Sequence, residues 1–455
     1  MRGNVAALFQ TNLVKNNMRP AEQLPLCHIA FGVDKEQQGT SGTRGNTPMS
    51  HLRVVWVIPT LGAGGIGPVC RCAAQAVSKR FGSEYTVLSL HEPPDAWTDK
   101  DSGARFVSIG MPMDAPKRFL EWLGNNPQDV VISNDVSTIE SCFPFFPEGV
   151  VHIVQMHDSG RRYLNVAIRN RRVIDGVLCV ARNVEAKLRS RLGNAHFQGL
   201  VGTVYNGADF PTQPMRKAHD RPLRLLFMGR LDPLIKGIFD LVQILHRVHK
   251  MGVPVELIIA GGRNKALESR FKKRRLDRLV SWVGCVPHED CYALAAESDV
   301  FLMTSRREPF GMVTIEAMAM GCVPLAYDIA SGSREIIEHG KSGLLLPLGD
   351  FNAWADCIRS LHEDRRRLLE LSQAAMVRAR THFNSENLAR GMADFLAAVQ
   401  LNSRNYPARR SLGMPVPGGS IGKTISYSRL PAWFRGWVRN AVGSHPHLSW
   451  WWLNR

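Results

Sequence analysis

The chain has 455 residues, of which 44% are hydrophobic and 21% charged, so it can bury the cores of roughly two to three domains. The net charge is +17, and residues 400–455 carry eight Lys or Arg and no Asp or Glu. No run of about 18 apolar residues is present, which argues against a membrane-spanning helix. The nine cysteines lack the paired spacing of a zinc site, and we expect reduced thiols in a cytosolic protein.

The first 50 residues are polar and rich in Gly, Ser and Thr, and they predict a disordered leader without the apolar core of a signal peptide. Residues 52–59 (LRVVWVIP) form a nearly continuous apolar run, which is typical of a strand buried on both faces of a parallel sheet. A Gly-rich loop (TLGAGGIGP) and a helix beginning near Val69 follow. The glycines leave room for a ligand close to the backbone, although their spacing is not the dinucleotide fingerprint GxGxxG.

Alternating strands and helices continue through the first half of the chain and predict a parallel α/β sheet with helices on both faces. Further strands are expected at 85–90, 105–109, 130–133, 150–156 and 176–180, and a helix at 116–123. His157 and Asp158 follow one of these strands at its carboxyl end, where ligands bind in such sheets. Asp99 and Asp101 lie in a polar loop without neighbouring ligands, so we expect no metal there.

Residues 204–222 contain three prolines and few apolar residues, and they predict a linker between two domains. A second α/β series follows it. Its expected strands are 223–228, 255–260, 281–283, 300–303, 323–327 and 343–346, and its expected helices are 239–249, 267–276, 290–297 and 312–320. Two such sheets joined by a linker enclose a cleft, which is the commonest place for a ligand.

The most informative stretch runs from residue 305 to 350. Glu308 lies in the loop that leads into the expected helix 312–320, and Glu316 lies about one turn inside that helix. Pro309 suits the first turn of a helix, and the free amides from Phe310 to Met312 favour an anion or a cluster of oxygens at the helix N-terminus. Two carboxylates beside such a terminus predict a ligand that carries both hydroxyl groups and phosphate.

Several segments resemble the group-1 family of retaining nucleotide-sugar glycosyltransferases with the GT-B fold. They are VYNGAD, GRLDPLIKG, EPFGMVTIEAMAMGCVPLA and GLLLPLGD. The resemblance covers about residues 52 to 399 and is strongest in the second half. It implies an α/β fold of two Rossmann-like parallel-sheet domains facing across a cleft. The expected division is a leader at 1–50, an acceptor domain at 51–210, a donor domain at 211–382, a crossover helix at 383–399 and a basic, Trp-rich extension at 400–455.

The residues themselves indicate a diphosphate site, because Arg230 and Lys236 follow the carboxyl end of a strand in a Gly-containing loop. The resemblance implies that these two cations bind the donor diphosphate and stabilise the leaving group. It also implies that Glu316 accepts hydrogen bonds from the ribose hydroxyls and that Glu308 contacts the transferred sugar. Solvated surface cations and a surface ion pair are the alternatives.

Further site residues follow from the resemblance. The amides of Phe310, Gly311 and Met312 would bind sugar hydroxyls or phosphate, and Val286 would contact the base through its backbone. Gly65 and Gly67, in the Gly-rich loop of the first domain, would approach the donor phosphates. His157 would hydrogen-bond the donor sugar near its reacting carbon, although a purely structural histidine is an equal alternative on the residues alone.

The expected activity is transfer of a hexosyl unit from a UDP- or GDP-sugar to a hydroxyl of a saccharide or lipid-linked acceptor. The implied role is synthesis of a cell-surface polysaccharide or glycolipid, with retention of configuration and without metal or cofactor. Same-face attack, assisted by the leaving phosphate, is the preferred mechanism because no carboxylate nucleophile can be identified. A nucleotide-sugar epimerase and a catalytically silent binding protein are the alternatives. The first would need additional acid/base carboxylates near the sugar.

The C-terminal extension combines basic residues with five tryptophans, Trp433, Trp437, Trp450, Trp451 and Trp452. Basic side chains beside aromatic ones suit an anionic membrane surface, which predicts a cytoplasmic protein peripheral to the inner face of the plasma membrane through residues 430–455. Packing of this extension on the first domain is the equal alternative. A nucleic-acid partner is not expected, because the basic tail contains no recognisable binding module.

Overall fold

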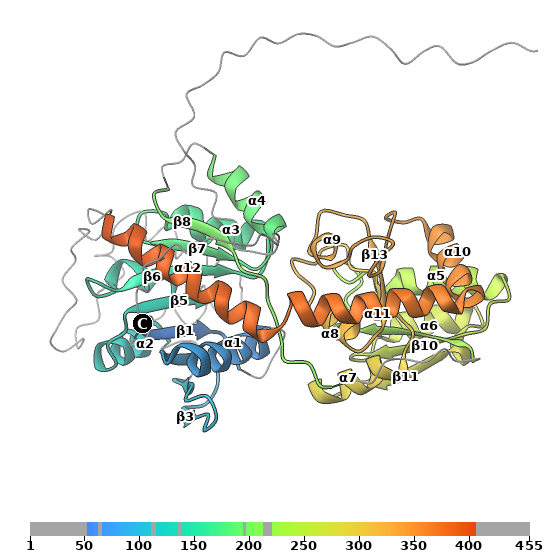
Figure 1. Ribbon diagram of the computed structural model, residues 1–455, viewed down its shortest axis with the longest axis horizontal. Coiled ribbons are helices and arrows are strands. Elements are labelled where there is room, and N and C mark those ends of the chain that lie inside the picture. Colours follow the sequence, from blue (N-terminus) through green and yellow to red (C-terminus); the bar gives the residue numbers. More distant parts are fainter. Residues whose placement is uncertain are drawn as a thin grey trace, which may run out of the picture.

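The computed structural model describes residues 52–405 apart from 62–65, 111–114, 135–138, 194–196 and 213–220. The expected leader at 1–50 and the basic extension beyond 405 lie outside the described residues. Two sheets, each flanked by helices, lie side by side and are spanned by the long helices near the C-terminal end of the described chain (Figure 1). The predicted fold class, two parallel-sheet α/β domains, is confirmed.

The first sheet has the strand order β3-β4-β2-β1-β5-β6-β7-β8. Its strands are β1 (Arg53–Ile58), β2 (Glu84–Ser89), β3 (Asp95–Thr98), β4 (Arg105–Ser108), β5 (Val130–Asn134), β6 (Val151–Met156), β7 (Gly176–Cys179) and β8 (Leu200–Thr203). All described neighbours pair in parallel except β3, which pairs antiparallel with β4 at the edge. The sequence analysis did not predict β3 or β8. Strand β3 is short and all its residues are exposed, so it lacks the buried apolar run that marks the other strands.

The helices of the first domain cover both faces of its sheet. They are α1 (Ile66–Phe81), α2 (Ala115–Asn125), α3 (Arg161–Arg169), α4 (Arg182–Leu192) and the 3-10 helix η1 (Glu140–Phe145). One face of β1 packs Trp56 against α1 and against α12 (Ser385–Asn405), which returns from the far end of the chain. The other face packs Val55 and Val57 against α2, α3 and α4. Strand β1 is apolar along its length because each of its faces is covered.

The second sheet has the order β11-β10-β9-β12-β13-β14, and its described pairs are parallel. Its strands are β9 (Leu223–Met228), β10 (Val255–Ala260), β11 (Val280–Gly284), β12 (Val300–Met303), β13 (Val323–Tyr327) and β14 (Leu344–Leu346). Its helices are α5 (Ile238–Lys250), α6 (Lys265–Lys273), η2 (Asp277–Leu279), α7 (His288–Glu297), α8 (Met312–Ala319), α9 (Ser333–Ile336), α10 (Phe351–Glu363) and α11 (Arg365–His382). Every strand and helix expected in this half is present, within a few residues of the predicted bounds.

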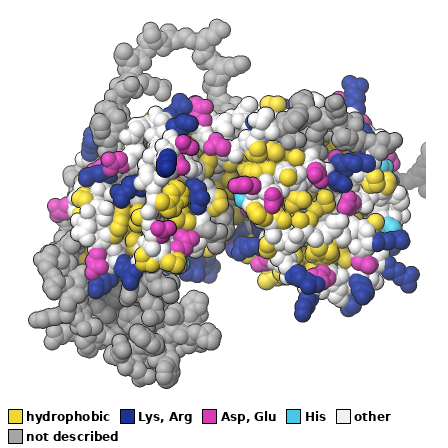
Figure 2. Space-filling view, turned by 90° about the horizontal axis from the view of Figure 1, so that it is seen from below, with side chains coloured by type: hydrophobic (Ala, Val, Ile, Leu, Met, Phe, Trp, Pro, Cys, Tyr) yellow, Lys and Arg dark blue, Asp and Glu magenta, His cyan; other side chains and the backbone are white. Residues whose placement is uncertain are grey.

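Two connections join the domains, and they run side by side. Ala208 on the outgoing segment forms a parallel bridge with Asn384, which lies just before α12. Gly207 is packed so closely there that a Cβ atom would lie 2.3 Å from the carbonyl oxygen of Asn384. The surface is hollowed between the two lobes (Figure 2). The division predicted at residues 210 and 211 remains a prediction, because residues 213–220 are not described.

Candidate functional site

Parallel strands end at the same edge of a sheet, so the loops after β9, β11 and β12 meet at the carboxyl edge of the second sheet. The loop after β9 carries Arg230 and Lys236, the loop after β11 carries Val286, and the loop after β12 carries Glu308. Helix α8 begins directly after this last loop. The sheet topology thus brings the predicted donor-binding residues of the second domain to one edge.

Lys236 and Glu308 form the central ion pair of this edge. The Lys236 Nζ atom lies 2.6 Å from Glu308 Oε2, and the two side chains are only 16% and 12% exposed. Ser305 also donates its hydroxyl to the same carboxylate at 3.2 Å. The proposed phosphate cation and the proposed sugar carboxylate therefore neutralise each other, and a donor must compete for or join this pair.

The loop that carries Lys236 is held by its own backbone contacts. Asp232 accepts hydrogen bonds from the amides of Leu234 and Ile235, both at 2.8 Å, and these bonds hold the pKa of its carboxyl below the usual value. Gly237 has a φ of +60°, and a Cβ atom there would lie 2.2 Å from the carbonyl oxygen of Thr304, so only glycine fits. Arg230 is exposed and forms no ion pair with any described residue, which leaves its guanidinium open to an anionic ligand.

The N-terminus of α8 opens onto the same edge. Gly311, the residue before the helix, has a φ of +115°, which turns the chain sharply after Glu308. The amides of Gly311, Met312 and Val313 donate no hydrogen bond to any other described residue, as expected for the first turn of a helix. Three free N–H groups beside Lys236 suit phosphate or sugar oxygens.

Glu316 faces a partner that the sequence analysis missed. Its Oε1 atom lies 2.9 Å from Nε2 of His288, the first residue of α7, and the Glu316 side chain is 7% exposed. The hydrogen bond to this carboxylate raises the pKa of His288, while partial burial opposes that rise. His288 follows the predicted base-contacting Val286 by two residues, a position that could have identified it as a site residue.

His157 lies at the carboxyl end of β6 in the first domain, where its ring is fixed by Asn134. The Asn134 amide nitrogen donates to the carbonyls of Val57 and Ile132, so its oxygen faces His157 Nε2 at 2.8 Å. Nε2 therefore carries the proton. Burial lowers the pKa of His157 to about 4, so the ring is neutral at pH 7 and Nδ1 can accept a hydrogen bond from a sugar hydroxyl.

Neighbouring residues bring the His157 and Glu308 loops face to face. Asp158, next to His157, lies 3.1 Å from the guanidinium of Arg307, next to Glu308. This ion pair crosses from one domain to the other. The sequence placed His157 and Glu308 in different domains, and the structure shows that their loops meet.

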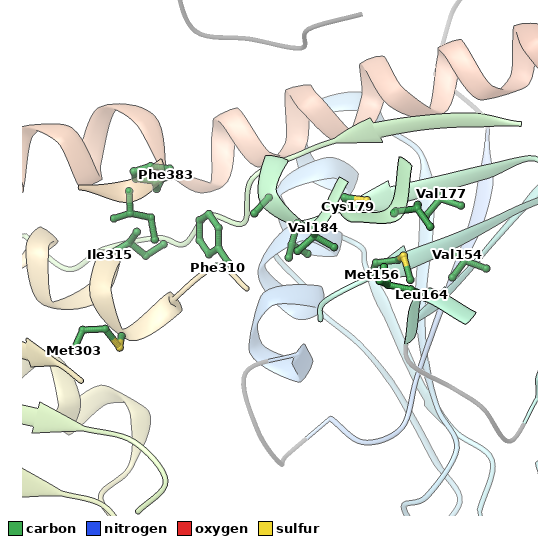
Figure 3. Close-up of a cluster of buried hydrophobic side chains, with 14 of the residues drawn as sticks. Val154, Met156, Leu164, Val177, Cys179, Val184, Met303, Phe310, Ile315 and Phe383 are labelled. Atoms are coloured by element: carbon green, nitrogen blue, oxygen red, sulfur yellow. The ribbon is translucent and has the colours of Figure 1, made fainter. Parts of the chain in front are cut away.

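The side chain of Phe310 is buried between aromatic rings. It is 3% exposed, and its ring centroid lies 6.0 Å from that of Tyr205 and 5.8 Å from that of Phe383. Figure 3 shows Phe310 and Phe383 in this cluster. Tyr205 belongs to the outgoing connection, and Phe383 immediately precedes the return into α12. The loop that carries Glu308 is thereby packed against both interdomain connections.

The Gly-rich loop of the first domain is only partly described. Gly65 lies outside the described residues. Gly67 is in the first turn of α1, where a Cβ atom would lie 2.3 Å from the carbonyl oxygen of Leu61. Close packing against this backbone is therefore sufficient to require a glycine at this position. Its predicted contact with the donor remains a prediction.

The described residues contain no cluster of three or more His, Cys, Asp or Glu side chains able to hold a metal ion. Asp99, of the pair considered in the sequence, accepts hydrogen bonds from Ser102 instead. None of the eight cysteines in the described part of the chain forms a disulfide. None of the described helices is long and apolar enough to cross a membrane.

Comparisons with known proteins show which family the second domain resembles. Residues 210–378 match the family model of glycosyl transferases group 1, so the predicted resemblance is confirmed for the second domain. The glycogen synthase of Mycobacterium tuberculosis is 28% identical over 213 residues, which are 46% of this chain and 51% of that protein. The chain thus spans about half the length of the curated relatives it matches.

Solved structures share the fold over a larger part of the chain. The sucrose-phosphate synthase of Thermosynechococcus elongatus has a TM-score of 0.65 at 20% identity and covers 76% of this chain and 99% of its own. The Anabaena protein Alr3699/HepE, solved with UDP-glucose, has a TM-score of 0.61 at 19% identity and covers 76% and 100%. At this identity the likeness establishes the GT-B fold.

Proposed function

From the group 1 glycosyltransferase match of residues 210–378, we propose that the protein transfers a hexosyl unit from a UDP- or GDP-sugar to an acceptor hydroxyl. One observation carries the proposal: Lys236, Glu308 and the free amides of α8 lie together at the carboxyl edge of the second sheet. Cations and amides suit the diphosphate, and the carboxylate suits sugar hydroxyls. The UDP-glucose bound by the Anabaena protein of the same fold supports a nucleotide-sugar donor.

Each residue has a proposed role. Lys236 and Arg230 bind the diphosphate and stabilise the charge that develops on the leaving phosphate, and the amides of Phe310, Gly311 and Met312 add to this stabilisation. Glu308 contacts the transferred sugar, and Glu316 accepts from the ribose after parting from His288. Val286 contacts the base through its backbone.

We further propose that transfer proceeds with retention, by attack on the face from which the phosphate leaves. His157 directly precedes Asp158 of the Asp158–Arg307 contact, and its neutral Nδ1 accepts a hydrogen bond from the sugar. A neutral imidazole positions a hydroxyl without adding charge beside the developing oxocarbenium ion. Replacing Glu308 with Gln and finding a covalent sugar on another residue by mass spectrometry would contradict same-face attack.

The acceptor is proposed to be a saccharide or lipid-linked hydroxyl in cell-surface polysaccharide or glycolipid synthesis, and the reaction to need no metal. The glycogen synthase relative supports a polysaccharide product. The membrane contact is proposed for residues 430–455, which lie outside the described residues. Deletion of residues 406–455, just after α12, is expected to abolish binding to vesicles with anionic headgroups and to leave UDP binding intact. Unchanged vesicle binding would contradict the membrane contact.

The central test is nucleotide binding by thermal shift and calorimetry. UDP or GDP at about 100 times its Kd should stabilise the protein by about 2.7 kcal/mol. At the same nucleotide concentration the Lys236→Met variant should lose about half of this stabilisation or more, whereas Lys341→Met, at an exposed lysine of the same domain, should keep it. Slow release of nucleotide from UDP-glucose or GDP-mannose without acceptor would then identify a transferase. Absence of binding to every nucleoside diphosphate would refute the proposed function.

A further inference from the structure

The N-terminus of α4, in the first domain, lacks a capping side chain of its own. Ala181 occupies the N-cap position, and its methyl side chain cannot accept a hydrogen bond from the amides of Arg182 and Asn183. The carboxylate of Glu335, from α9 of the second domain, takes this place. Its two oxygens accept from the amides of Arg182 and Asn183, both at 2.8 Å. The helix cap is thus supplied across the domain interface.

Asn183 extends the contact to the loop that carries Glu308. Its side-chain amide donates to Glu335 Oε1 at 2.8 Å and to the carbonyl oxygen of Pro309 at 3.0 Å. Pro309 directly follows Glu308. A side chain of the first domain therefore holds the backbone of the proposed sugar-binding loop in the second.

Helix α9 is packed tightly against the loop that carries Glu308. The Gly332 amide, at the start of α9, donates to the carbonyl of Glu308 at 2.8 Å, and a Cβ atom on Gly332 would lie 2.2 Å from the carbonyl oxygen of Phe310. Arg378 of α11 holds the other end of α9 through the carbonyl of Glu335 at 3.0 Å. A displacement of Glu335 would therefore also move the backbone on both sides of Glu308.

We propose that Asn183 and Glu335 are positioning residues that set the Glu308 loop for sugar transfer only while the two domains are closed. This inference rests on the proposed function. Apart from the predicted approach of Gly65 and Gly67 to the phosphates, the proposed nucleotide contacts come from Lys236, Arg230, Glu316 and the loop after β11, all in the second domain. Nucleotide binding therefore does not need the Asn183–Glu335 contact. Transfer does, because the carboxylate that contacts the sugar lies in the loop that Asn183 holds. Domain opening frees the first amides of α4 and releases the Pro309 carbonyl together.

The sharpest variant is Asn183→Asp. It places a carboxylate against the carboxylate of Glu335, where like charges repel, and against the Pro309 carbonyl, where two hydrogen-bond acceptors face each other. An acidic residue in the first turn nevertheless suits α4 itself. The repairing variant adds Glu335→Gln, which removes the like-charge repulsion while its carbonyl oxygen can still accept from one of the two α4 amides. The matched control is Asn165→Asp on α3 of the same domain, because Asn165 accepts from Arg191 and a carboxylate can keep that bond.

Hydrogen exchange tests the contact without requiring activity. In the wild-type chain the amides of Arg182 and Asn183 should exchange slowly for a helix start, because Glu335 binds both. Asn183→Asp should speed exchange at residues 182–183 and 308–312 and increase the radius of gyration in solution scattering. The repaired double variant should return towards the wild type, and Asn165→Asp should not differ from it. Unchanged exchange at 308–312 in Asn183→Asp, with the chain folded by circular dichroism, would overturn the proposal.

The kinetic readout separates positioning from folding. With UDP as the binding probe and UDP-glucose or GDP-mannose as the donor, Asn183→Asp should keep its UDP Kd within about twofold and lose about tenfold or more in kcat. Equal losses in UDP affinity and kcat would overturn the positioning role. If the wild-type chain binds no nucleotide, the proposed function fails, and the exchange and scattering results still decide whether Asn183 and Glu335 hold the domains together.

Discussion

Variants of the Lys236–Glu308 ion pair can separate its contribution to folding stability from its contribution to nucleotide binding. At 2.6 Å and an effective dielectric constant of about 20, the gross Coulomb attraction is about 6 kcal/mol. Desolvation of two mostly buried side chains cancels much of this, so a net coupling of about 2 kcal/mol is expected. Lys236→Met should therefore destabilise the chain by about 2–3 kcal/mol, because Glu308 stays buried without its cation.

The double variant Lys236→Met/Glu308→Gln measures this coupling. Its destabilisation should be smaller than the sum of the two single variants by about 2 kcal/mol, since both charges are then absent. Urea unfolding followed by circular dichroism gives the three free energies. Additive single variants would refute the calculated coupling.

The two single variants should differ in their affinity for UDP. Lys236→Met should weaken UDP binding by about tenfold or more, because a charge-assisted contact to phosphate is lost. Glu308→Gln should bind UDP as tightly as the wild type or more tightly, because Lys236 is released from its carboxylate, and yet it should lose sugar transfer. Calorimetry with UDP and an assay of UDP-glucose turnover test both. Equal weakening of UDP binding in the two variants would refute the assigned roles.

Three further predictions follow from the site. The carboxylate of Glu316 raises the pKa of His288, so UDP should bind the wild type better as rising pH deprotonates His288 and frees Glu316. Calorimetry should show a weaker pH dependence of UDP binding in His288→Asn. Equal pH profiles in the two proteins would contradict this competition. The pKa of His157 is lowered to about 4, so the unfolded chain binds its proton first and stability should fall as pH drops from about 6.5 towards 4. His157→Gln should reduce that slope by at most about 1.4 kcal/mol per pH unit in urea unfolding, and an unchanged slope would count against it. Gly311→Ala should destabilise the chain by about 1–2 kcal/mol, because alanine is strained at the φ of +115° found there. Gly124→Ala in α2, with open space around it, should instead stabilise the chain. Thermal unfolding compares the two variants, and equal shifts in Tm would argue against strain at Gly311.

Much of the fold could be predicted because its signals are local. Strands such as β1 and β9 are apolar along their length since both faces are buried, and Gly311 ends the β12 loop where the helix begins. The exposed edge strand β3 was missed because it buries neither face. The placement of Glu308 before the helix and of Glu316 inside it also followed from local spacing.

The interaction partners of the site carboxylates depend on the tertiary structure. Glu316 pairs with a histidine 28 positions away, and Glu335 caps a helix 152 positions away, and no sequence period encodes either pairing. Ala181 at the start of α4 carried a local signal, a helix without a capping side chain, but only the approach of the second domain supplies the carboxylate. The sequence alone determined which residues carry charge at the strand ends. The packing of one domain on the other decided which of those charges neutralise each other and which hold the site in place, because both depend on distances across an interface that local chain geometry does not set.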